Sequence, residues 1–278
     1  MTFRKSIIDI QKIKSSGKKI SMITAYDYSS GYLAEKAGVD IILIGDSMGQ
    51  VVFGYDTTLP VSMEDIIRHT QMVVRGTENT HIVSDLPFMS YQVNVDQAVL
   101  NAGRLVKEGG CQSVKLEGGA SMGAQVKAIV NAGIPVMGHL GLTPQSVNQL
   151  GGYRVQSRSK SQIRKIFNDI VELEKAGAFA VILELVPREV ASALTQKVQI
   201  PVIGIGAGPD CDGQVQVFHD LLGLYKDFTP KHSRIYANIG DQITKSLGSY
   251  VADVISGDFP DDEESFHIEP GVLSDVFE

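Results

Sequence analysis

Carboxylate and hydroxyl side chains stand directly after a short apolar run near the N-terminus of this chain. The run Val39–Ile44 is apolar except for one residue, and it ends in Gly45-Asp46-Ser47. A short apolar run bounded by glycine is typical of a strand that is buried on both faces. In a parallel α/β protein, ligands bind at the carboxyl ends of such strands. We therefore expect Asp46 and Ser47 to belong to a binding site.

Further acidic side chains follow other apolar runs in the same way. Asp85 ends the run HIVSD, Glu117 follows another run, and the last run is followed by His219 and Asp220. Carboxylates that converge at one rim offer the oxygen ligands that Mg²⁺ or Mn²⁺ prefers, and no Cys or His spacing fits zinc. The pattern thus predicts a divalent-metal site formed by Asp46, Asp85 and Glu117. The alternative is that the two aspartates only cap helices or order loops.

Three more side chains are suited to binding an anion or moving a proton. Lys115 lies two residues before Glu117, so both point to one face of a strand; Lys115 either neutralises an anionic substrate or simply pairs with Glu117. Glu184 follows an apolar run, where a carboxyl group is suited to take up a proton near neutral pH. Its alternatives are a helix cap and an ion pair with Arg188. His139, between two glycines, is either a pocket residue or a hydrogen-bonded core histidine.

A repeated pattern would position these residues. Helix-like segments end in glycine, short apolar strands follow, and polar or glycine-rich turns close each unit. The glycines at 38, 109, 133 and 177 stand where helices take left-handed caps. Eight strands fit the chain, at 20–25, 41–45, 81–85, 113–116, 135–138, 180–183, 202–205 and 214–218. Eight parallel strands with intervening helices predict an α/β protein with a (β/α)8 TIM barrel. An open doubly wound sheet is the competitor, and the eighth strand decides between them.

The connections and the two ends of the chain complete the expected organisation. Long connections at 47–60 and 140–160 lie on the expected active face, and such loops are typically lids or binding loops. Residues 6–16 predict a helix that caps the other end of the barrel. Residues 241–256 have the pattern of a final amphipathic helix.

Charge and composition exclude several classes of protein. The net charge is −7, but nine acidic and no basic residues follow Lys245, so residues 1–245 carry about +2. We therefore expect one barrel domain over 1–278 with an acidic tail at about 257–278. The body has no basic stripe for nucleic acid, and no apolar run approaches the roughly 18 residues of a membrane span. Two cysteines are too few for a disulfide framework. We expect a cytoplasmic protein that acts on small molecules.

Long motifs along the chain carry a family resemblance. They are MITAYDYSSGYLAEKAGVDIILIGDSMGQVVFGYDTTLPVSMEDIIRHTQ (22–71), SDLPFMSYQ (84–92), VKLEGG (114–119), GHLGLTPQSVNQLGGYRVQ (138–156), LELVP (183–187) and PVIGIGAGPDCDGQVQVFHDLLGL (201–224). Together they resemble the ketopantoate hydroxymethyltransferase family. The resemblance covers roughly residues 2–270 in order, and the motifs are specific because they are long.

The resemblance implies a fold, an assembly and a reaction. The fold is a (β/α)8 barrel of the phosphoenolpyruvate/pyruvate type, and the assembly is a homo-oligomer, a decamer of two pentameric rings. The reaction transfers a hydroxymethyl group from the co-substrate 5,10-methylenetetrahydrofolate to 3-methyl-2-oxobutanoate (α-ketoisovalerate). It produces 2-dehydropantoate (ketopantoate) through a Mg²⁺-stabilised enolate. This reaction is the first committed step of pantothenate biosynthesis, which leads to coenzyme A.

The resemblance also carries over residue by residue. The family's magnesium ligands match Asp46, Asp85 and Glu117. Its substrate-binding residues match Asp46, Ser47, Asp85, Lys115 and His139. Its proton acceptor matches Glu184. The resemblance assigns no residue to the folate.

Two rival functions fit parts of the pattern. A Mg²⁺-dependent carbon–carbon lyase or mutase acting on 2-oxo acids or phosphoenolpyruvate would use the same carboxylate rim. Such a lyase usually carries a reactive cysteine in a lid loop, and neither Cys111 nor Cys211 stands in an expected lid. A non-enzymatic protein that keeps the barrel as a scaffold is disfavoured, because every candidate catalytic side chain is present.

Overall fold

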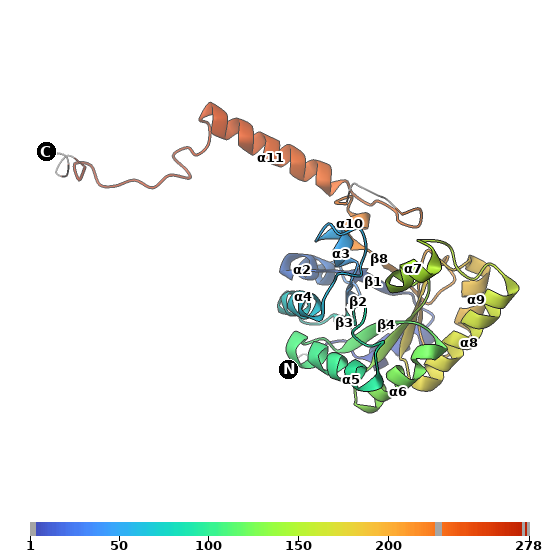
Figure 1. Cartoon of the computed structure of the whole chain (residues 1–278). Coiled ribbons are helices and arrows are strands. Elements are labelled where there is room, and N and C mark those ends of the chain that lie inside the picture. The colour runs from blue at the N-terminus through green and yellow to red at the C-terminus, as the bar shows by residue number, and fades with distance from the viewer. Residues whose placement is uncertain (1–3, 226–229, 274–275, 277–278) are drawn as a thin grey trace.

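Eight parallel strands form a closed barrel in the computed structural model, which describes residues 4–225, 230–273 and 276 (Figure 1). The strands are β1 (Ile20–Thr24), β2 (Ile41–Ile44), β3 (His81–Asp85), β4 (Ser113–Glu117), β5 (Val136–Gly141), β6 (Ala180–Glu184), β7 (Val202–Ile205) and β8 (Gly213–Gln216). The sheet closes because β8 pairs with both β7 and β1. This closure confirms the predicted (β/α)8 barrel and excludes the open doubly wound sheet.

Helices surround the barrel and share a core with the outer faces of the strands. The longer ones are α2 (Tyr28–Lys36), α4 (Met63–Arg75), α5 (Val95–Arg104), α6 (Gly123–Asn131), α8 (Lys160–Ala176) and α9 (Arg188–Lys197). The short ones are α3 (Met48–Val51), η1 (Leu105–Gly109), η2 (Ala120–Met122), η3 (Pro144–Ser146), α7 (Val147–Leu150) and α10 (Phe218–Leu221). A second apolar cluster, which includes Met22, Leu43 and Ile203, fills the barrel itself. Because the interior is packed, a ligand site can form only at an end of the barrel.

The N-terminal helix α1 (Ile7–Ser15) lies at the end of the barrel where the strands begin. Its Ile10 is fully buried in the cluster that fills the barrel. His81, the first residue of β3, contacts the Lys5 carbonyl oxygen and the Ser113 hydroxyl, both at 2.8 Å. These contacts make this end a structural one, with its polar groups already paired.

One of the four predicted left-handed caps is displaced by a residue. Gly38, Gly133 and Gly177 have positive φ angles, as expected, but the fourth such residue is Gly110 and not Gly109. The reason is the π-helical turn η1, which widens the helix and adds one residue before the chain reverses.

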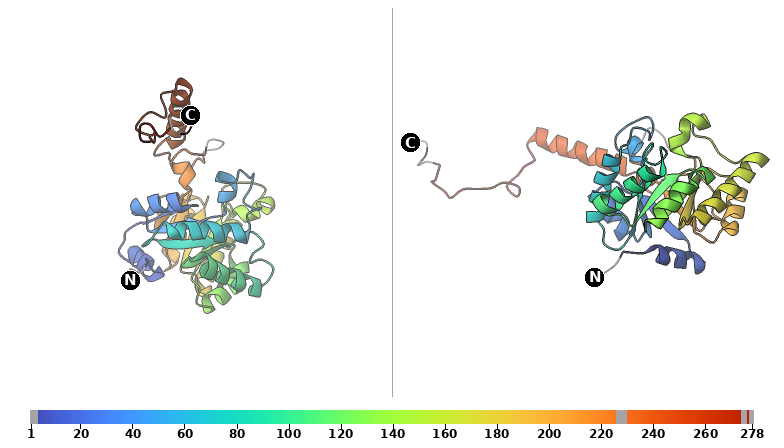
Figure 2. Two further views of the ribbon diagram at one scale, coloured as in Figure 1. Left: turned by 90° about the vertical axis from the view of Figure 1, so that its left-hand side faces the viewer. Right: turned by 60° about the horizontal axis from the view of Figure 1, so that its bottom comes forward.

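The last helix, α11 (Ile239–Ser256), extends away from the barrel (Figures 1 and 2). It corresponds to the helix predicted at 241–256. One face carries the exposed apolar residues Ile243, Leu247, Tyr250, Val251 and Val254. The predicted acidic tail follows, but its residues 274–275 and 277–278 lie outside the described part of the chain. Among the described helices, none combines the length and the apolar content that crossing a membrane requires.

We expect Ile10→Ala to lower the free energy of unfolding by about 2–5 kcal/mol, because it leaves a cavity in the barrel core. The matched control is Ile8→Ala on the same helix, where the side chain is 59% exposed and the expected loss is below about 0.5 kcal/mol. Urea unfolding at one fixed protein concentration measures both values. Equal losses in the two variants would contradict the packing of α1 against the barrel.

Candidate active site

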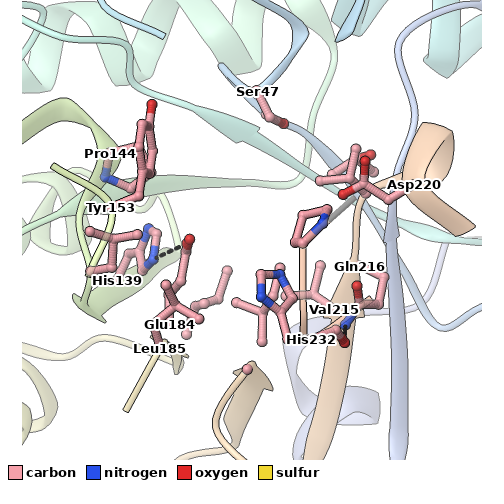
Figure 3. Close-up of a pocket in the computed structure, with 18 of the residues that line it drawn as sticks. Ser47, His139, Pro144, Tyr153, Glu184, Leu185, Val215, Gln216, Asp220 and His232 are labelled. Atoms are coloured by element: carbon pink, nitrogen blue, oxygen red, sulfur yellow. Dashed lines mark hydrogen bonds and ion pairs between the residues drawn. The ribbon is translucent and has the colours of Figure 1, made fainter. Parts of the chain in front are cut away.

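A cavity of about 910 Å³ lies at the carboxyl ends of the strands (Figure 3). Its lining includes all seven residues predicted from the sequence, namely Asp46, Ser47, Asp85, Lys115, Glu117, His139 and Glu184. The structure therefore brings every predicted site residue into one space. Their roles in binding and catalysis are taken up below.

The register of the parallel strands explains why these side chains meet. Asp85 in β3 pairs with Lys115 in β4, and Glu117 in β4 pairs with His139 in β5. Glu184 ends β6 beside the last residue of β5. Residues in register on adjacent strands lie about 5 Å apart, and side chains two residues apart share a face. The strand ends therefore place acidic and basic groups next to each other around the rim.

Lys115 forms the centre of a buried charge cluster. Its Nζ lies 2.9 Å from Oδ1 of Asp85 and 3.8 Å from Oε1 of Glu117. Burial opposes the charged ammonium, but the carboxylates of Asp85 and Glu117 outweigh it and raise the pKa of Lys115. The closest partner is therefore Asp85, and not Glu117 as a simple pair within β4 would require.

Two carboxyl groups of the cluster are poorly compensated. Burial, and then the charges of Asp85 and Glu117, raise the pKa of Asp46 to about 8. Burial also raises the pKa of Asp85, although Lys115 opposes this effect. The site thus holds more acidic groups than its cations can neutralise. Over the described residues, however, no group of three or more His, Cys, Asp or Glu side chains is arranged to hold a metal ion.

His139 lies between two carboxylates and contacts both. Its Nδ1 is 3.3 Å from Oε1 of Glu117, and its Nε2 is 3.1 Å from Oε2 of Glu184 (Figure 3). Burial and the Lys115 ammonium oppose the charged imidazole, but Glu117 and Glu184 outweigh them and raise the pKa of His139 to about 9. Arg188, the alternative partner of Glu184, pairs instead with Asp210 at 2.8 Å. Glu184 therefore lies beside an imidazole whose raised pKa favours its charged form.

Gln145 in η3 is a site residue that the sequence did not reveal. Its Nε2 donates to Oδ2 of Asp46 at 2.9 Å and to the Leu86 carbonyl oxygen at 3.0 Å. Its backbone N–H donates to Oε2 of Glu117 at 3.0 Å, and its Oε1 accepts from the Tyr91 hydroxyl at 2.8 Å. One buried side chain thus ties the long loop after β5 to the carboxylates of β2 and β4. Only the folded loop makes this role visible.

Ser47 and Asp220 also line the cavity. The Ser47 hydroxyl lies 2.8 Å from the hydroxyl of Tyr26, which fixes the start of α3 against the end of β1. Asp220, in α10 after β8, lines the cavity with 8% of its surface exposed. Burial raises the pKa of Asp220 to about 6. The sequence places Asp220 at a strand end, but it contains no sign of this burial.

Comparison with known proteins places the chain in a family. A sequence profile described as ketopantoate hydroxymethyltransferase matches residues 4–262. The chain belongs to this family. It is 50% identical over 274 residues to a 3-methyl-2-oxobutanoate hydroxymethyltransferase of Clostridium beijerinckii, which covers 99% of this chain and 100% of the relative. A 3-methyl-2-oxobutanoate hydroxymethyltransferase of Moorella thermoacetica is 54% identical over 263 residues, 95% of this chain and 98% of the relative. The chain is thus a transferase enzyme of the ketopantoate hydroxymethyltransferase family.

Solved structures of other enzymes share the fold. A 2,3-dimethylmalate lyase, described as a member of the PEP mutase/isocitrate lyase superfamily, superposes with a TM-score of 0.60 at 16% identity, covering 97% of this chain and 93% of its own. A phosphonopyruvate hydrolase in complex with oxalate and Mg²⁺ superposes with a TM-score of 0.60 at 13% identity, covering 99% and 94%. At these identities the likeness concerns the fold alone. It agrees with the closed eight-stranded parallel barrel of this chain.

We expect Gln145→Leu to lower the enzyme's kcat/KM by about tenfold to a hundredfold, because the carboxylates of Asp46 and Glu117 lose the group that orients them. The matched control is Gln71→Leu, which removes an amide that donates to the Glu108 carbonyl oxygen outside the cavity. A steady-state assay of hydroxymethyl transfer measures both variants. An equal loss in the two, or no loss in Gln145→Leu, would show that Gln145 does not position the site.

Proposed function

We propose that this enzyme transfers a hydroxymethyl group from 5,10-methylenetetrahydrofolate to 3-methyl-2-oxobutanoate and so produces 2-dehydropantoate, for pantothenate biosynthesis in the cytoplasm. The observation that carries the proposal is the juxtaposition of Glu184, in contact with His139, with the buried cluster around Lys115. This arrangement offers a base beside a site for an anion. The names of the relatives support the same substrate.

The donor set fits Mg²⁺. Asp85 Oδ1 and Glu117 Oε1 are buried and accept no hydrogen bond from the described residues, although each lies near Lys115. The acidic excess around Asp46 favours a further cation. We propose that Asp46 and Asp85 would hold Mg²⁺, with Glu117 reaching it through water, because Mg²⁺ keeps several waters and takes one or two carboxylates. When bound, the ion would supply Lewis-acid polarisation of the 2-oxo group.

The enzyme's own side chains would then bind and deprotonate the substrate. The Lys115 ammonium would balance the charge of the substrate carboxylate, and the Ser47 hydroxyl would contact the same end of the substrate. The Glu184 carboxylate would take the proton from C3, which leaves a nucleophilic carbon for the methylene group of the folate. His139, beside Glu184, would keep that carboxylate aimed at C3 while also lining the substrate pocket.

A lyase mechanism that uses a lid cysteine finds no support among the described residues. Cys111 and Cys211 are both buried, and burial raises the pKa of Cys111 to about 12. A thiol must ionise to react, so Cys111 is inert near neutral pH.

The test is loss of the C3 proton of α-ketoisovalerate into D₂O, followed by NMR with Mg²⁺ and without folate. We expect exchange in the wild type that needs Mg²⁺, and at least a hundredfold slower exchange, roughly, in Glu184→Gln, because a general base contributes about 10²–10⁴ in rate. Calorimetry should still show Mg²⁺-dependent binding of α-ketoisovalerate to Glu184→Gln. The control is Glu189→Gln, which changes an exposed acid on α9. Exchange that survives in Glu184→Gln would remove Glu184 from the role of base.

We also propose that the enzyme is a homo-oligomer, a decamer. The exposed apolar face of α11 supports association with other copies, because a soluble helix buries such a face against a partner. We expect Leu247→Lys to shift sedimentation to smaller species. Lys245→Ala, on the opposite face of α11, should not change it. A wild-type monomer, or an unchanged assembly in Leu247→Lys, would contradict the role of this face.

A further inference from the structure

Asp220 is a buried carboxylate to which the mechanism above assigns no task. It is 8% exposed and lines the cavity, and its carboxylate has no hydrogen bond or ion pair with any residue that the structure describes. Burying an ionised carboxylate without a partner is costly. A side chain of this kind that faces a cavity is therefore suited to receive hydrogen bonds from a ligand.

The position of Asp220 separates its ligand from the 2-oxo acid. Figure 3 shows Asp220 on the opposite side of the cavity from His139 and Glu184, with His232 between them. The 2-oxo acid is an anion, so Lys115 attracts it and the carboxylate of Asp220 repels it. The ligand of Asp220 is thus the other reactant.

The size of the cavity leaves room for that reactant. At about 910 Å³ the cavity lies near the top of the range of about 300–1,000 Å³ for drug-sized ligands. A 2-oxo acid of about eight non-hydrogen atoms fills only a fraction of such a pocket. The lining also includes the apolar residues Leu185, Ile205 and Val215, which suit a flat heterocycle.

The charges along the cavity match a reduced folate in one orientation. The pyrimidine ring of tetrahydrofolate presents two adjacent donors, N3–H and the 2-amino group, which a carboxylate can accept with both oxygens. The other end of the folate is anionic. Lys231 lines the cavity and is exposed, whereas Arg188, which also lines it, is paired with Asp210. A buried acceptor and an exposed cation therefore complement the two ends of one molecule.

We infer that Asp220 binds the N3–H and 2-amino edge of the tetrahydrofolate pyrimidine ring, with the glutamate tail directed toward Lys231. The inference rests on the proposed use of 5,10-methylenetetrahydrofolate and assigns a residue to its recognition. Asp220 would thus hold the folate while Glu184, across the cavity, deprotonates the 2-oxo acid.

The first experiment separates the two substrates. In Asp220→Asn we expect the KM for 5,10-methylenetetrahydrofolate to rise at least about tenfold, because hydrogen bonds to a charged acceptor are lost. The KM for α-ketoisovalerate and the folate-free exchange of its C3 proton should stay within about twofold of the wild type. Unchanged exchange also shows that the variant is folded. The control is Asp96→Asn, which removes one exposed charge at the start of α5 and should change neither KM.

The second experiment identifies the atoms that Asp220 recognises. Calorimetry compares tetrahydrofolate with 2-desamino-2-methyl-tetrahydrofolate, which lacks the 2-amino donor. The wild type should bind the analogue at least about tenfold more weakly, whereas Asp220→Asn should bind the two ligands within about twofold of each other. If Asp220→Asn still discriminates between the two ligands, another group must recognise the 2-amino edge of the pyrimidine ring.

The other outcomes of these experiments distinguish failure of the inference from failure of the proposed function. An unchanged folate KM in Asp220→Asn overturns the inference and leaves the proposed reaction intact. Slowed C3 exchange in Asp220→Asn would assign Asp220 to the 2-oxo acid and would equally overturn it. Failure of wild-type exchange, or of tetrahydrofolate binding to the wild type, would refute the proposed function and the inference with it.

Discussion

The burial of more acidic than basic groups at one rim of the barrel is the constraint on which the site depends. Charges removed from water are tolerated only when partners and hydrogen bonds hold them. Lys115 and His139 supply the positive charge, and each contacts two carboxylates. Because each cation contacts two carboxylates, displacing one side chain of the cluster would weaken more than one ion pair. The carboxylates outnumber the two cations. Their mutual repulsion destabilises the site by itself and favours the binding of a divalent cation.

Further hydrogen bonds hold the carboxylates of this cluster in fixed positions. The loop after β5 folds over the rim, and Gln145 uses its side-chain amide and its backbone N–H to hold carboxylates from two strands. Gln145 itself is held by the hydroxyl of Tyr91. A long loop is costly to order, and here these buried hydrogen bonds offset that cost. The loop is thus part of the site rather than only a cover for it.

The two ends of the barrel have different roles: one stabilises the fold, and the other carries the cavity. At the end where the strands begin, Ile10 of α1 packs into the barrel core and both ring nitrogens of His81 have partners. At the other end, carboxylates remain without full partners, and the cavity between them is large. The cavity also has two chemically distinct sides, because the charge cluster lies on β2 to β6 and Asp220 follows β8. Such a division suits a reaction between an anionic acid and a larger second substrate.

Much of this organisation could be predicted from residue types and their order. Short apolar runs bounded by glycine predict buried parallel strands, because only apolar side chains can fill both faces of such a strand. Such runs, with three more strands fitted between them, predicted the barrel, and the polar residues at several strand ends predicted which side chains share the cavity. The displaced cap at Gly110 was missed, since a π-helical turn depends on packing and not on local sequence.

The sequence by itself therefore determined the strand count and the identity of seven residues around the cavity, because these follow from local polarity and the two-residue period of a strand. It did not determine every strand end, since β5 continues to Gly141 beyond the predicted 138 and β8 ends at Gln216 before the predicted 218. Only the tertiary structure decided that Gln145 reaches Asp46, 99 residues away along the chain. It alone showed that His139 is shared by two carboxylates and that the buried carboxylate of Asp220 has no hydrogen bond or ion pair to the described part of the chain. These are properties of distances between separate segments, and such distances exist only after the barrel has closed.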